Sequence, residues 1–406
     1  MIVSSMNKKQ KVVIIGHSFT SRLGLVWALA DLNCEIIILA MVGPNPKGEG
    51  LEIFKDIDFY SKYVSEVIYF GKSEDELLIA LNRISARGEG KVILIPDSDF
   101  SSCVIDDHRE ELKDRFIFPY IKGEGTVKDW NDKSRQKSLA ESVGLKTAHS
   151  VSIDIKNQKF TLPDDIHYPC FPKALSTILG GKRGLERCDN EEQLRSALKS
   201  MARYYDLQVL LEDYMEIENE YAVLGFSDGE HVTIPGMIEI LSSSIYRPGI
   251  AKFGRVTGIE GYEDTVEKFK MFVKQLGFVG IFDIDFYRSR GELYFSEINL
   301  RFGGSGYAVT KMGANLPAMY VKYLMGHDIS GMETEIHCNK TYANERLCMD
   351  DWYRAFDSTK QYFKYMRDAD IHFLDNPDDK APGRAYKRRF IKNYVKRTLK
   401  KWTGRI

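Results

Sequence analysis

The 406-residue sequence lacks the patterns that mark membrane spans, zinc sites and disulfide frameworks. No run approaches the ~18 apolar residues of a membrane helix, and the longest, at 36–42, has the length of a strand. The six cysteines form no C-x-x-C pair, and the eight histidines show neither H-x-x-x-H nor H-E-x-x-H spacing. The sequence therefore indicates no transmembrane segment, no disulfide scaffold and no transition-metal site.

Targeting and nucleotide-binding fingerprints are also missing near the N-terminus. The first ten residues, MIVSSMNKKQ, have no apolar signal core, so we expect a cytoplasmic protein. The segment GHSFTSRLG after the first predicted strand is neither G-x-G-x-x-G nor G-x-x-x-x-G-K-[ST]. Ser18, Thr20 and Arg22 at the following helix start could bind an anionic substrate group, or the turn is purely architectural.

What is present in residues 1–125 is an alternation of strands and helices. Apolar runs at 11–16, 34–42, 65–70 and 91–96 are separated by helical patterns, which predicts a parallel Rossmann-like sheet covered on both faces. Asp97, Ser98 and Asp99 follow the last of these strands. They lie at the edge where ligands bind in such sheets, or they cap a turn.

The stretch 282–306, FDIDFYRSRGELYFSEINLRFGGSG, concentrates acidic side chains in a predicted β-hairpin. With Gly291 central in the turn, Asp285 falls opposite Glu297 and Asp283 opposite Asn299. Opposed like charges repel, so we expect a hard cation, Mg²⁺ or Mn²⁺, between them. The alternative is an exposed hairpin with solvated acids.

Other cations and glycines suit a phosphorylated ligand. Arg301, one period beyond Asn299, is suited to a phosphate or carboxylate. Lys133 in the first turn of a helix opposes the helix dipole, which invites an anion. Lys173 lies on a strand before a loop with Gly180, Gly181 and Gly184, and ammonium and backbone N–H groups there can close over phosphate.

A second group of candidates is predicted to contact the substrate. Arg247, Lys252 and Arg255 gather in a Ser/Gly-rich loop and suit a carboxylate or an acyl phosphate, although ordinary solvated loop charges explain them nearly as well. Gly304 and Ser305 follow Arg301 in a segment where glycine permits close backbone approach to a ligand.

Together these segments resemble the ATP-grasp superfamily. The stretches LIPDSDF, FIFPYI, NDKSRQKSLAESVGL and GFVGIFDIDF…SEINLRFGGSGYAVTKMGANL are most similar to carboxylate–amine ligases of the D-aspartate ligase kind, and more distantly to carbamoyl-phosphate synthetase. The resemblance covers roughly residues 11–326. It implies an α/β fold with a Rossmann-like pre-ATP-grasp domain (1–125) and an ATP-grasp domain (126–335) of two α+β subdomains, lid-bearing (126–205) and metal-bearing (206–335).

The resemblance also implies residue roles around ATP and Mg²⁺. Lys133, Lys173 and the glycine loop would contact phosphate, and Arg301, Lys173 and Asn299 would act in catalysis. The expected adenine-reading groups are Glu212, the Asp213 carbonyl and the Met215 amide, the ribose acceptor is Glu220, and the metal ligands are Asp285, Glu297 and Asn299.

The activity implied is an ATP-dependent ligase that activates a carboxylate as an acyl phosphate for attack by an amine. The expected substrates are small-molecule carboxylates and amines, including lipid-linked precursors of cell walls or surface glycans. A carbamoyl-phosphate-synthetase-like enzyme, a carboxylate kinase and a non-catalytic nucleotide-binding protein remain alternatives, and a homodimer is left open.

The C-terminal region differs in composition from the rest. Residues 336–383 read as an accessory segment, and residues 384–406 as a basic amphipathic helical extension with ten Lys/Arg and no acid. The other residues hold 47 basic and 58 acidic side chains, a net charge of −11. The helix could lie on anionic lipid at the inner face of the membrane or dock on the acidic body; nucleic acid is not expected, since no accompanying fold is seen.

Overall fold

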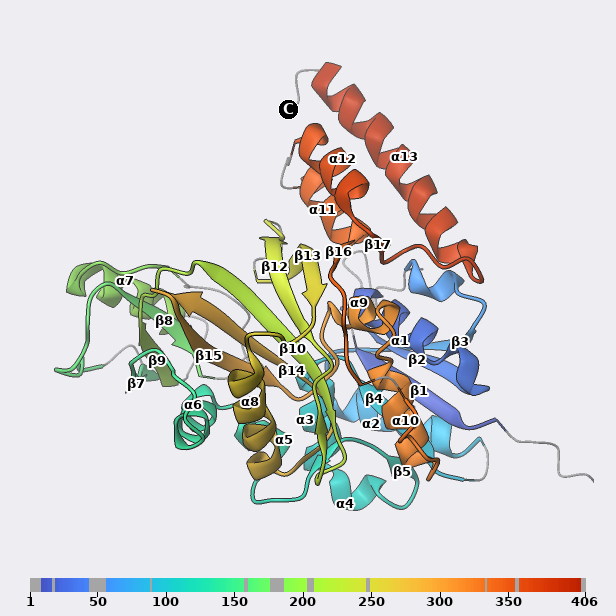
Figure 1. The fold of residues 1–406 in the computed structure, drawn as a ribbon, viewed down its shortest axis with the longest axis horizontal. Helices are drawn as coiled ribbons and strands as arrows, with labels where there is room; N and C mark the ends of the chain where they lie inside the picture. Colours follow the sequence, from blue (N-terminus) through green and yellow to red (C-terminus); the bar gives the residue numbers. More distant parts are fainter. Residues whose placement is uncertain are drawn as a thin grey trace, which may run out of the picture.

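The computed structural model describes residues 9–16, 19–43, 56–87, 90–156, 160–175, 186–202, 208–245, 249–332, 334–354 and 358–402, with only the backbone of residues 19, 20, 400 and 401. The described chain forms three sheets with helices packed around them (Figure 1). The predicted α/β class is confirmed, including a parallel N-terminal sheet and a C-terminal helix.

The N-terminal sheet is parallel and covered on both faces. Its elements are β1 (Lys11–Gly16), α1 (Phe19–Ala28), η1 (Ala30–Leu32), β2 (Glu35–Met41), η2 (Asp58–Tyr60), β3 (Val64–Phe70), α2 (Glu74–Ser85), β4 (Val92–Pro96), α3 (Asp99–Asp107), α4 (Arg109–Leu112) and β5 (Phe116–Ile117), with strand order β3-β2-β1-β4-β5. Val12 and Ile14 pack in the core that contains α1, whereas Val13 and Ile15 pack in the core that contains α2. The strand order reverses between β1 and β4, so their carboxyl ends border the crevice where such sheets bind ligands.

A second, nine-stranded sheet is almost entirely antiparallel. Its strands are β6 (Tyr120–Ile121), β10 (Asn219–Ser227), β11 (Val232–Thr233), β12 (Met237–Ser243), β13 (Ala251–Thr257), β14 (Phe278–Ser289), β15 (Glu292–Asn299), β16 (Lys340–Ala343) and β17 (Ile371–His372). The order is β15-β14-β10-β12-β13-β16-β17, with β11 on β10 and β6 on β14. Since β16 pairs with β13, the predicted boundary at residue 335 divides one continuous sheet.

Helices cover both faces of this large sheet. The short helices α5 (Val127–Trp130) and α9 (Gly306–Lys311) accompany the longer α6 (Lys133–Ser142), α8 (Glu263–Leu276) and α10 (Leu316–Leu324). Phe269 and Phe272 of α8 pack against Phe286 and Phe295 in one core. On the other face, α9 and α10 lie beside α1 (Figure 1), and their side chains share a core with it. The N-terminal sheet and the large sheet are therefore joined by one apolar core.

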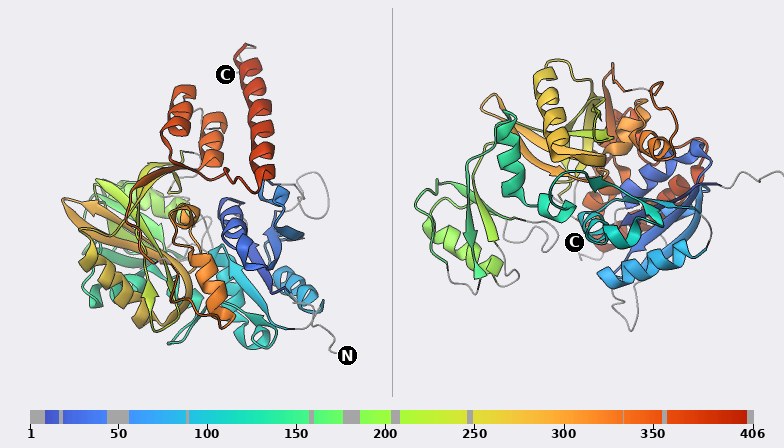
Figure 2. Two further views of the ribbon diagram at one scale, coloured as in Figure 1. Left: turned by 45° about the vertical axis from the view of Figure 1, so that its right-hand side comes forward. Right: turned by 90° about the horizontal axis from the view of Figure 1, so that it is seen from below.

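The third sheet stands at one edge of the molecule (Figure 2). It consists of β7 (Ser150–Asp154), β8 (Cys170–Ala174) and β9 (Gln208–Asp213) in the antiparallel order β7-β9-β8, covered by α7 (Glu191–Ala202). Its separate core includes Ile153, Leu194, Leu198 and Val209. We call it the lid sheet. Because β9 is its central strand, the predicted subdomain boundary at residue 205 cuts the sheet as well.

The C-terminal helices α11 (Glu345–Arg354), α12 (Thr359–Asp368) and α13 (Lys380–Trp402) project from the end of the large sheet (Figure 1). Trp352 of α11 stacks on Phe390 and Tyr394 of α13 at ring-centroid distances of 5.2 and 6.0 Å, and the Arg397 guanidinium lies 4.6 Å from its centroid. The helix predicted at 384–406 begins four residues earlier, at Lys380. One of its faces packs against α11. Among the described residues, no helix is long and apolar enough to cross a membrane.

The contact between α1 and α9 can be tested at Gly24. A Cβ there would lie 2.8 Å from the Cβ of Tyr307, so Gly24→Val overpacks the shared core. We expect the free energy of unfolding to fall by about 1–3 kcal/mol, because overpacking exceeds the few tenths by which valine favours a helix over glycine. Chemical denaturation measures this. Gly331→Val is the control, since a Cβ at Gly331 meets no atom within 4 Å; equal stability of both variants would contradict the overpacking argument.

Candidate active site

The hairpin of β14 and β15 places acidic side chains opposite one another as the sequence predicted. Asp285 pairs with Glu297, and Asp283 pairs with Asn299, in antiparallel register. Side chains two residues apart point to the same face, so all four lie on one face of the hairpin. The pairing prediction is confirmed.

The turn that produces this pairing is not centred on Gly291. Arg290 and Gly291, with φ of 50° and 77°, together form a two-residue turn of the kind that favours tight hairpins. From that turn Phe286 pairs with Phe295, and a one-residue register shift follows, with Ser296 as the extra residue of β15. Without this β-bulge the residues beyond it would point to the opposite face. The bulge therefore aims the functional end of β15.

Burial makes the carboxylate cluster electrostatically costly without a cation. Burial raises the pKa of Asp283 to about 6; Arg301 opposes this shift and Glu297 adds to it. Burial, followed by the charges of Asp283 and Glu297, raises the pKa of Asp285 well above its usual value. The Oδ1 atom of Asp283 is buried without a hydrogen-bond partner. The oxygen-rich donor set fits a hard divalent cation such as Mg²⁺.

Lys133 is the nearest ammonium to this cluster. Its Nζ lies 2.5 Å from the Glu297 Oε2. Asp132 caps α6 by accepting hydrogen bonds from the Ser134 and Arg135 amides, which places Lys133 in the first turn as predicted. Burial opposes protonation of Lys133, but the Glu297 carboxylate outweighs it and raises the lysine pKa. The same pair lowers the pKa of Glu297 despite burial.

Arg301 connects the hairpin to the N-terminal sheet. Its Nη2 donates to the Asn299 Oδ1 at 3.1 Å, and its Nε donates to the Asp99 Oδ1 at 3.1 Å. The Asn299 side-chain amide in turn donates to the Asp285 Oδ2 at 3.2 Å. Burial opposes the charge of Arg301, but the carboxylates of Asp99 and Asp283 outweigh it and raise the arginine pKa. Asp99, noted in the sequence as a sheet-edge acid, therefore orients Arg301.

Glu212 holds two lysines. Lys173 Nζ contacts its Oε1, and Lys137 Nζ lies 2.8 Å from its Oε2. Burial opposes ionisation, but the charges of Lys173 and Lys137 outweigh it and lower the pKa of Glu212. The carboxylate is thus engaged by ammonium groups, and its expected role at an adenine edge stays a prediction. Sequence reasoning missed Lys137, although it lies one helical turn after Lys133.

The other predicted nucleotide-binding residues lie near the junction of the lid sheet and the large sheet. Asp213 ends β9, Met215 follows it half-buried, and Glu220 lies on β10. The Ser243 hydroxyl donates to the Glu220 Oε2 at 3.4 Å. Their roles toward adenine and ribose stay predictions. Gly180, Gly181 and Gly184 fall outside the described residues.

Two predicted substrate cations are paired elsewhere. Lys252 Nζ lies 2.8 Å from the Asp351 Oδ2 in a buried ion pair between β13 and α11. Arg255 lies 3.1 Å from Glu239 across β12 and β13. The Arg255 pair follows from the pairing of β12 with β13, and the Lys252 pair from the packing of α11 on β13; the sequence shows neither contact, and the partners of both cations are not the hairpin carboxylates. The third predicted cation, Arg247, lies outside the described residues.

The segment after Arg301 packs closely against the acids. A Cβ at Gly303 would lie 2.2 Å from the Asp283 Oδ2, whereas one at Gly304 would meet no atom within 4 Å. The Ser305 hydroxyl hydrogen-bonds the Tyr342 hydroxyl at 2.9 Å. Glycine is thus required beside Asp283, and Gly304 leaves room for an incoming group.

A second buried cluster lies at the carboxyl ends of β1 and β4. Arg22 donates to the Asp58 carboxylate at 2.7 Å and to the Gly16 carbonyl at 2.8 Å, so it braces the carboxyl end of β1. The Ser21 hydroxyl donates to Asp97 at 3.1 Å, and burial raises the pKa of Asp97 to about 7 against the opposing charge of Arg22. Ser18 and the Thr20 side chain fall outside the described structure.

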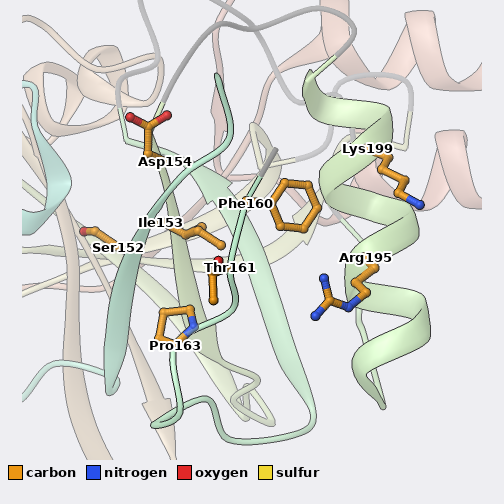
Figure 3. Close-up of a pocket in the computed structure, with 8 residues that line it drawn as sticks. All are labelled: Ser152, Ile153, Asp154, Phe160, Thr161, Pro163, Arg195 and Lys199. Atoms are coloured by element: carbon orange, nitrogen blue, oxygen red, sulfur yellow. The ribbon is translucent and has the colours of Figure 1, made fainter. Parts of the chain in front are cut away.

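A large open pocket lies on the lid sheet rather than at the hairpin. It has a volume of about 700 Å³. Figure 3 shows Ile153, Phe160 and Pro163 on one side and Arg195 and Lys199 of α7 on the other. It shares no residue with the hairpin site, so we assign the chemistry to the hairpin by its charges and not to the pocket by its size.

Comparison with known proteins assigns part of the chain to a domain family. Residues 138–317, which include the lid sheet, the hairpin and Arg301, match the family model of the ATP-grasp domain. The chain therefore contains an ATP-grasp domain. The predicted resemblance is confirmed for this part of the chain.

Two curated relatives match parts of the chain. The large chain of carbamoyl phosphate synthase from Gemmatimonas aurantiaca is 25% identical over 239 residues, 56% of this chain and 21% of that protein. D-alanine–D-alanine ligase from Fusobacterium nucleatum is 29% identical over 178 residues, 41% of this chain and 55% of that protein. The matched region thus spans from a fifth to about half of the relatives' length.

Solved structures show the same fold over most of the chain. N5-carboxyaminoimidazole synthetase from Staphylococcus aureus superposes with a TM-score of 0.61 at 15% identity, covering 87% of each chain. An L-amino acid ligase from Bacillus licheniformis gives a TM-score of 0.60 at 14% identity, covering 82% of this chain and 79% of the other. At these identities the likeness establishes the fold alone.

The raised pKa of Asp97 predicts a pH-dependent stability. Between pH about 4 and about 7, the Asp97 carboxyl loses its proton in the unfolded chain but keeps it in the folded chain. Wild-type stability should therefore fall as the pH rises through this range. Asp97→Asn should be more stable than wild type at pH 8, by on the order of 1–4 kcal/mol, because one pKa unit corresponds to about 1.4 kcal/mol. The gain should vanish near pH 4.

Denaturation at pH 4, 6 and 8 checks this prediction. Asp264→Asn is the control, because the Asp264 side chain is 83% exposed in its pair with Lys268. An Asp97→Asn variant that is less stable than wild type at pH 8 would show that the ionised carboxylate is stabilising there.

Proposed function

We propose that this chain is an ATP- and Mg²⁺-dependent carboxylate–amine ligase that forms an amide bond through an acyl phosphate. The observation that carries the proposal is the cluster of the buried Asp283 with the half-buried Asp285 and Glu297, with Lys133 and Arg301 beside it. The region 138–317, which matches the ATP-grasp domain, contains the three carboxylates and Arg301, and Lys133 lies just before it. The names of the relatives, a D-alanine–D-alanine ligase and an L-amino acid ligase, support the same class.

Asp285, Glu297 and Asn299 are the residues that would hold Mg²⁺ or Mn²⁺. The bound cation would neutralise charge on the ATP phosphates. Arg301, fixed by Asp99 and Asn299, presents its guanidinium beside these ligands and suits the transferred phosphoryl group or the substrate carboxylate. Phosphoryl transfer depends mainly on such positioning and charge stabilisation, so no protein nucleophile is required.

Two lysines are paired with carboxylates that they can leave for a nucleotide phosphate. Lys133 pairs with Glu297, and Lys173 pairs with Glu212. A phosphate oxygen offers each ammonium a stronger anionic partner, while a cation at Glu297 replaces the charge that Lys133 withdraws. Lys137 still balances Glu212 when Lys173 turns away. This exchange keeps the buried acids neutralised before and after nucleotide binding.

The reaction balances in two steps. A carboxylate oxygen of the substrate attacks the terminal phosphorus of ATP, the bond to the bridging oxygen breaks, and ADP leaves. The amine nitrogen then attacks the acyl carbon, the bond from that carbon to the phosphate oxygen breaks, and the nitrogen loses a proton. The products are an amide, ADP and phosphate. We propose amino acids and cell-wall or surface-glycan precursors, including lipid-linked ones, as the substrates to test.

The test is a screen for ADP release over amino acids and cell-envelope precursors. ADP release that requires both a carboxylate and an amine is the expected result. Asp285→Asn and Glu297→Gln should lose Mg²⁺-dependent turnover by at least about 100-fold while remaining folded, since preorganised charge stabilisation of the reacting groups is lost. Glu292→Gln is the matched control, because Glu292 lies on the same strand in an exposed pair with Lys146.

Other outcomes discriminate the alternatives. A phosphorylated product without amine attack would indicate a carboxylate kinase or a carbamoyl-phosphate-type enzyme. Nucleotide binding without ADP release on any substrate would indicate a non-catalytic protein. Full activity in Glu297→Gln would remove the metal assignment.

The outer face of α13 supports peripheral contact with an anionic membrane as part of this proposal. Ile391, Val395, Leu399 and Trp402 are 62%, 51%, 58% and 89% exposed at helical spacing. Basic residues flank them along the helix, and each contributes about 1 kcal/mol near an anionic surface. The inner face of α13 packs on Trp352, so the outer stripe remains accessible. Contact with the membrane would place the ligase near lipid-linked substrates.

Sedimentation of the full chain with vesicles of 70% phosphatidylcholine and 30% phosphatidylglycerol tests this contact. We expect binding at 50 mM salt, weaker binding at 500 mM, and loss of most binding in Val395→Glu/Leu399→Glu. Ile79→Glu is the control, since Ile79 of α2 is 49% exposed and lies outside the C-terminal helices. Failure to bind at low salt, or equal binding by all variants, would contradict membrane contact through α13.

A further inference from the structure

Three polar side chains converge at one end of the lid sheet. His149 immediately precedes β7, Asp213 ends β9, and His167 lies three residues before β8. Their potential ligand atoms all lie within 4.8 Å of one another, and no other group of three or more His, Cys, Asp or Glu ligands in the described part of the chain is as close. The antiparallel order β7-β9-β8 produces this convergence, because β9 ends where its two neighbours begin.

Each imidazole contacts a different oxygen of the Asp213 carboxylate. His149 Nδ1 lies 3.3 Å from the Asp213 Oδ1, and His167 Nδ1 lies 3.2 Å from the Oδ2. The two rings stack with centroids 4.5 Å apart and an angle of 27° between planes. The rings therefore lie stacked on one another, and the Nδ1 atom of each points to the Asp213 carboxylate.

The two nitrogen–oxygen distances are close to the distance between neighbouring ligand atoms in a zinc site. Zinc binds imidazole nitrogen and carboxylate oxygen at about 2.0–2.2 Å in tetrahedral geometry, which places neighbouring ligand atoms about 3.3–3.5 Å apart. The two nitrogen–oxygen distances, each to a different oxygen of Asp213, are in or near that range, and one ligand atom from each residue lies within 4.8 Å of the others, so small side-chain rotations would bring all three onto one ion. Two imidazoles with one carboxylate suit Zn²⁺ and similar transition metals, whereas Mg²⁺ prefers oxygen ligands throughout.

The alternative is an ordinary surface hydrogen bond, and the chain provides an example. His231 Nδ1 lies 3.2 Å from the Asp228 Oδ2, with its side chain 83% exposed. That pair has one imidazole, whereas Asp213 has two stacked imidazoles contributed by separate segments. Metal binding takes the deprotonated forms of its ligands, and two imidazole nitrogens and one carboxylate oxygen at this spacing can share one divalent cation.

We propose that His149, His167 and Asp213 form a binding site for a transition metal of the Zn²⁺ class, with the fourth position open to water. The site is separate from the hairpin carboxylates and does not depend on the proposed ligase activity. The side chains are 43%, 63% and 29% exposed, so the metal can enter and exchange. A bound ion would tie the ends of all three lid strands together and stabilise the lid sheet.

Titration of the full chain with Co²⁺ and Zn²⁺ in excess Mg²⁺ tests the proposal, because Mg²⁺ occupies oxygen-only sites. We expect one equivalent of Co²⁺ with the strong visible absorption of tetrahedral coordination, displaced by Zn²⁺. Zn²⁺ should also raise the unfolding temperature. His167→Ala should weaken binding about tenfold or more and abolish the thermal shift, and His149→Ala should do the same.

Two control variants locate the site. His231→Ala should bind Co²⁺ and Zn²⁺ like wild type, because it removes only the exposed pair of one histidine with Asp228. Cys338→Ser should also bind like wild type, which tests the exposed thiol beside His337 as an adventitious zinc ligand. Undiminished binding in His167→Ala and His149→Ala, loss of binding in Cys338→Ser, or absence of Co²⁺ binding to the wild type would each overturn the proposal.

Discussion

Repulsion among buried carboxylates is the constraint on which the rest of the structure depends. Asp283, Asp285 and Glu297 lie on one face of a hairpin, where burial and mutual charge oppose their ionisation. The fold answers with cations brought from other elements. Lys133 comes from the start of α6, and Arg301 follows β15 and is anchored to Asp99 of the N-terminal sheet. The site is therefore held together by charges that span both halves of the molecule.

The sequence predicted which side chains meet on the hairpin, but not the turn and bulge that bring them together. Asp285 was placed opposite Glu297 by taking Gly291 as the centre of the turn, whereas the structure reaches this pairing through a two-residue turn and a bulge at Ser296 that no local pattern encodes. The four-residue spacing from Lys133 to Lys137 was visible in the sequence. Its partner Glu212 was not, because that contact joins residues 75 positions apart.

The domain boundaries and the histidine cluster were hidden for the same reason. The resemblance implied boundaries at residues 205 and 335, but β9 pairs with β8 and β16 pairs with β13, so each of these sheets includes strands from both sides of a boundary. His149, His167 and Asp213 have no metal-binding spacing in sequence. They meet only because antiparallel pairing brings the ends of three strands together.

The position of α6 explains how the lid sheet and the hairpin can respond to one ligand. Lys133 on its first turn pairs with Glu297 of the hairpin, and Lys137 one turn later pairs with Glu212 of the lid sheet. Lys173, on the strand beside Glu212, completes the set. An anion that draws Lys133 and Lys173 toward itself changes the charge balance of both sheets at once. Under the proposed function, a phosphate and a cation bound here would therefore be electrostatically coupled to the lid strands through Lys133 and Lys137 of α6 and Lys173 of β8.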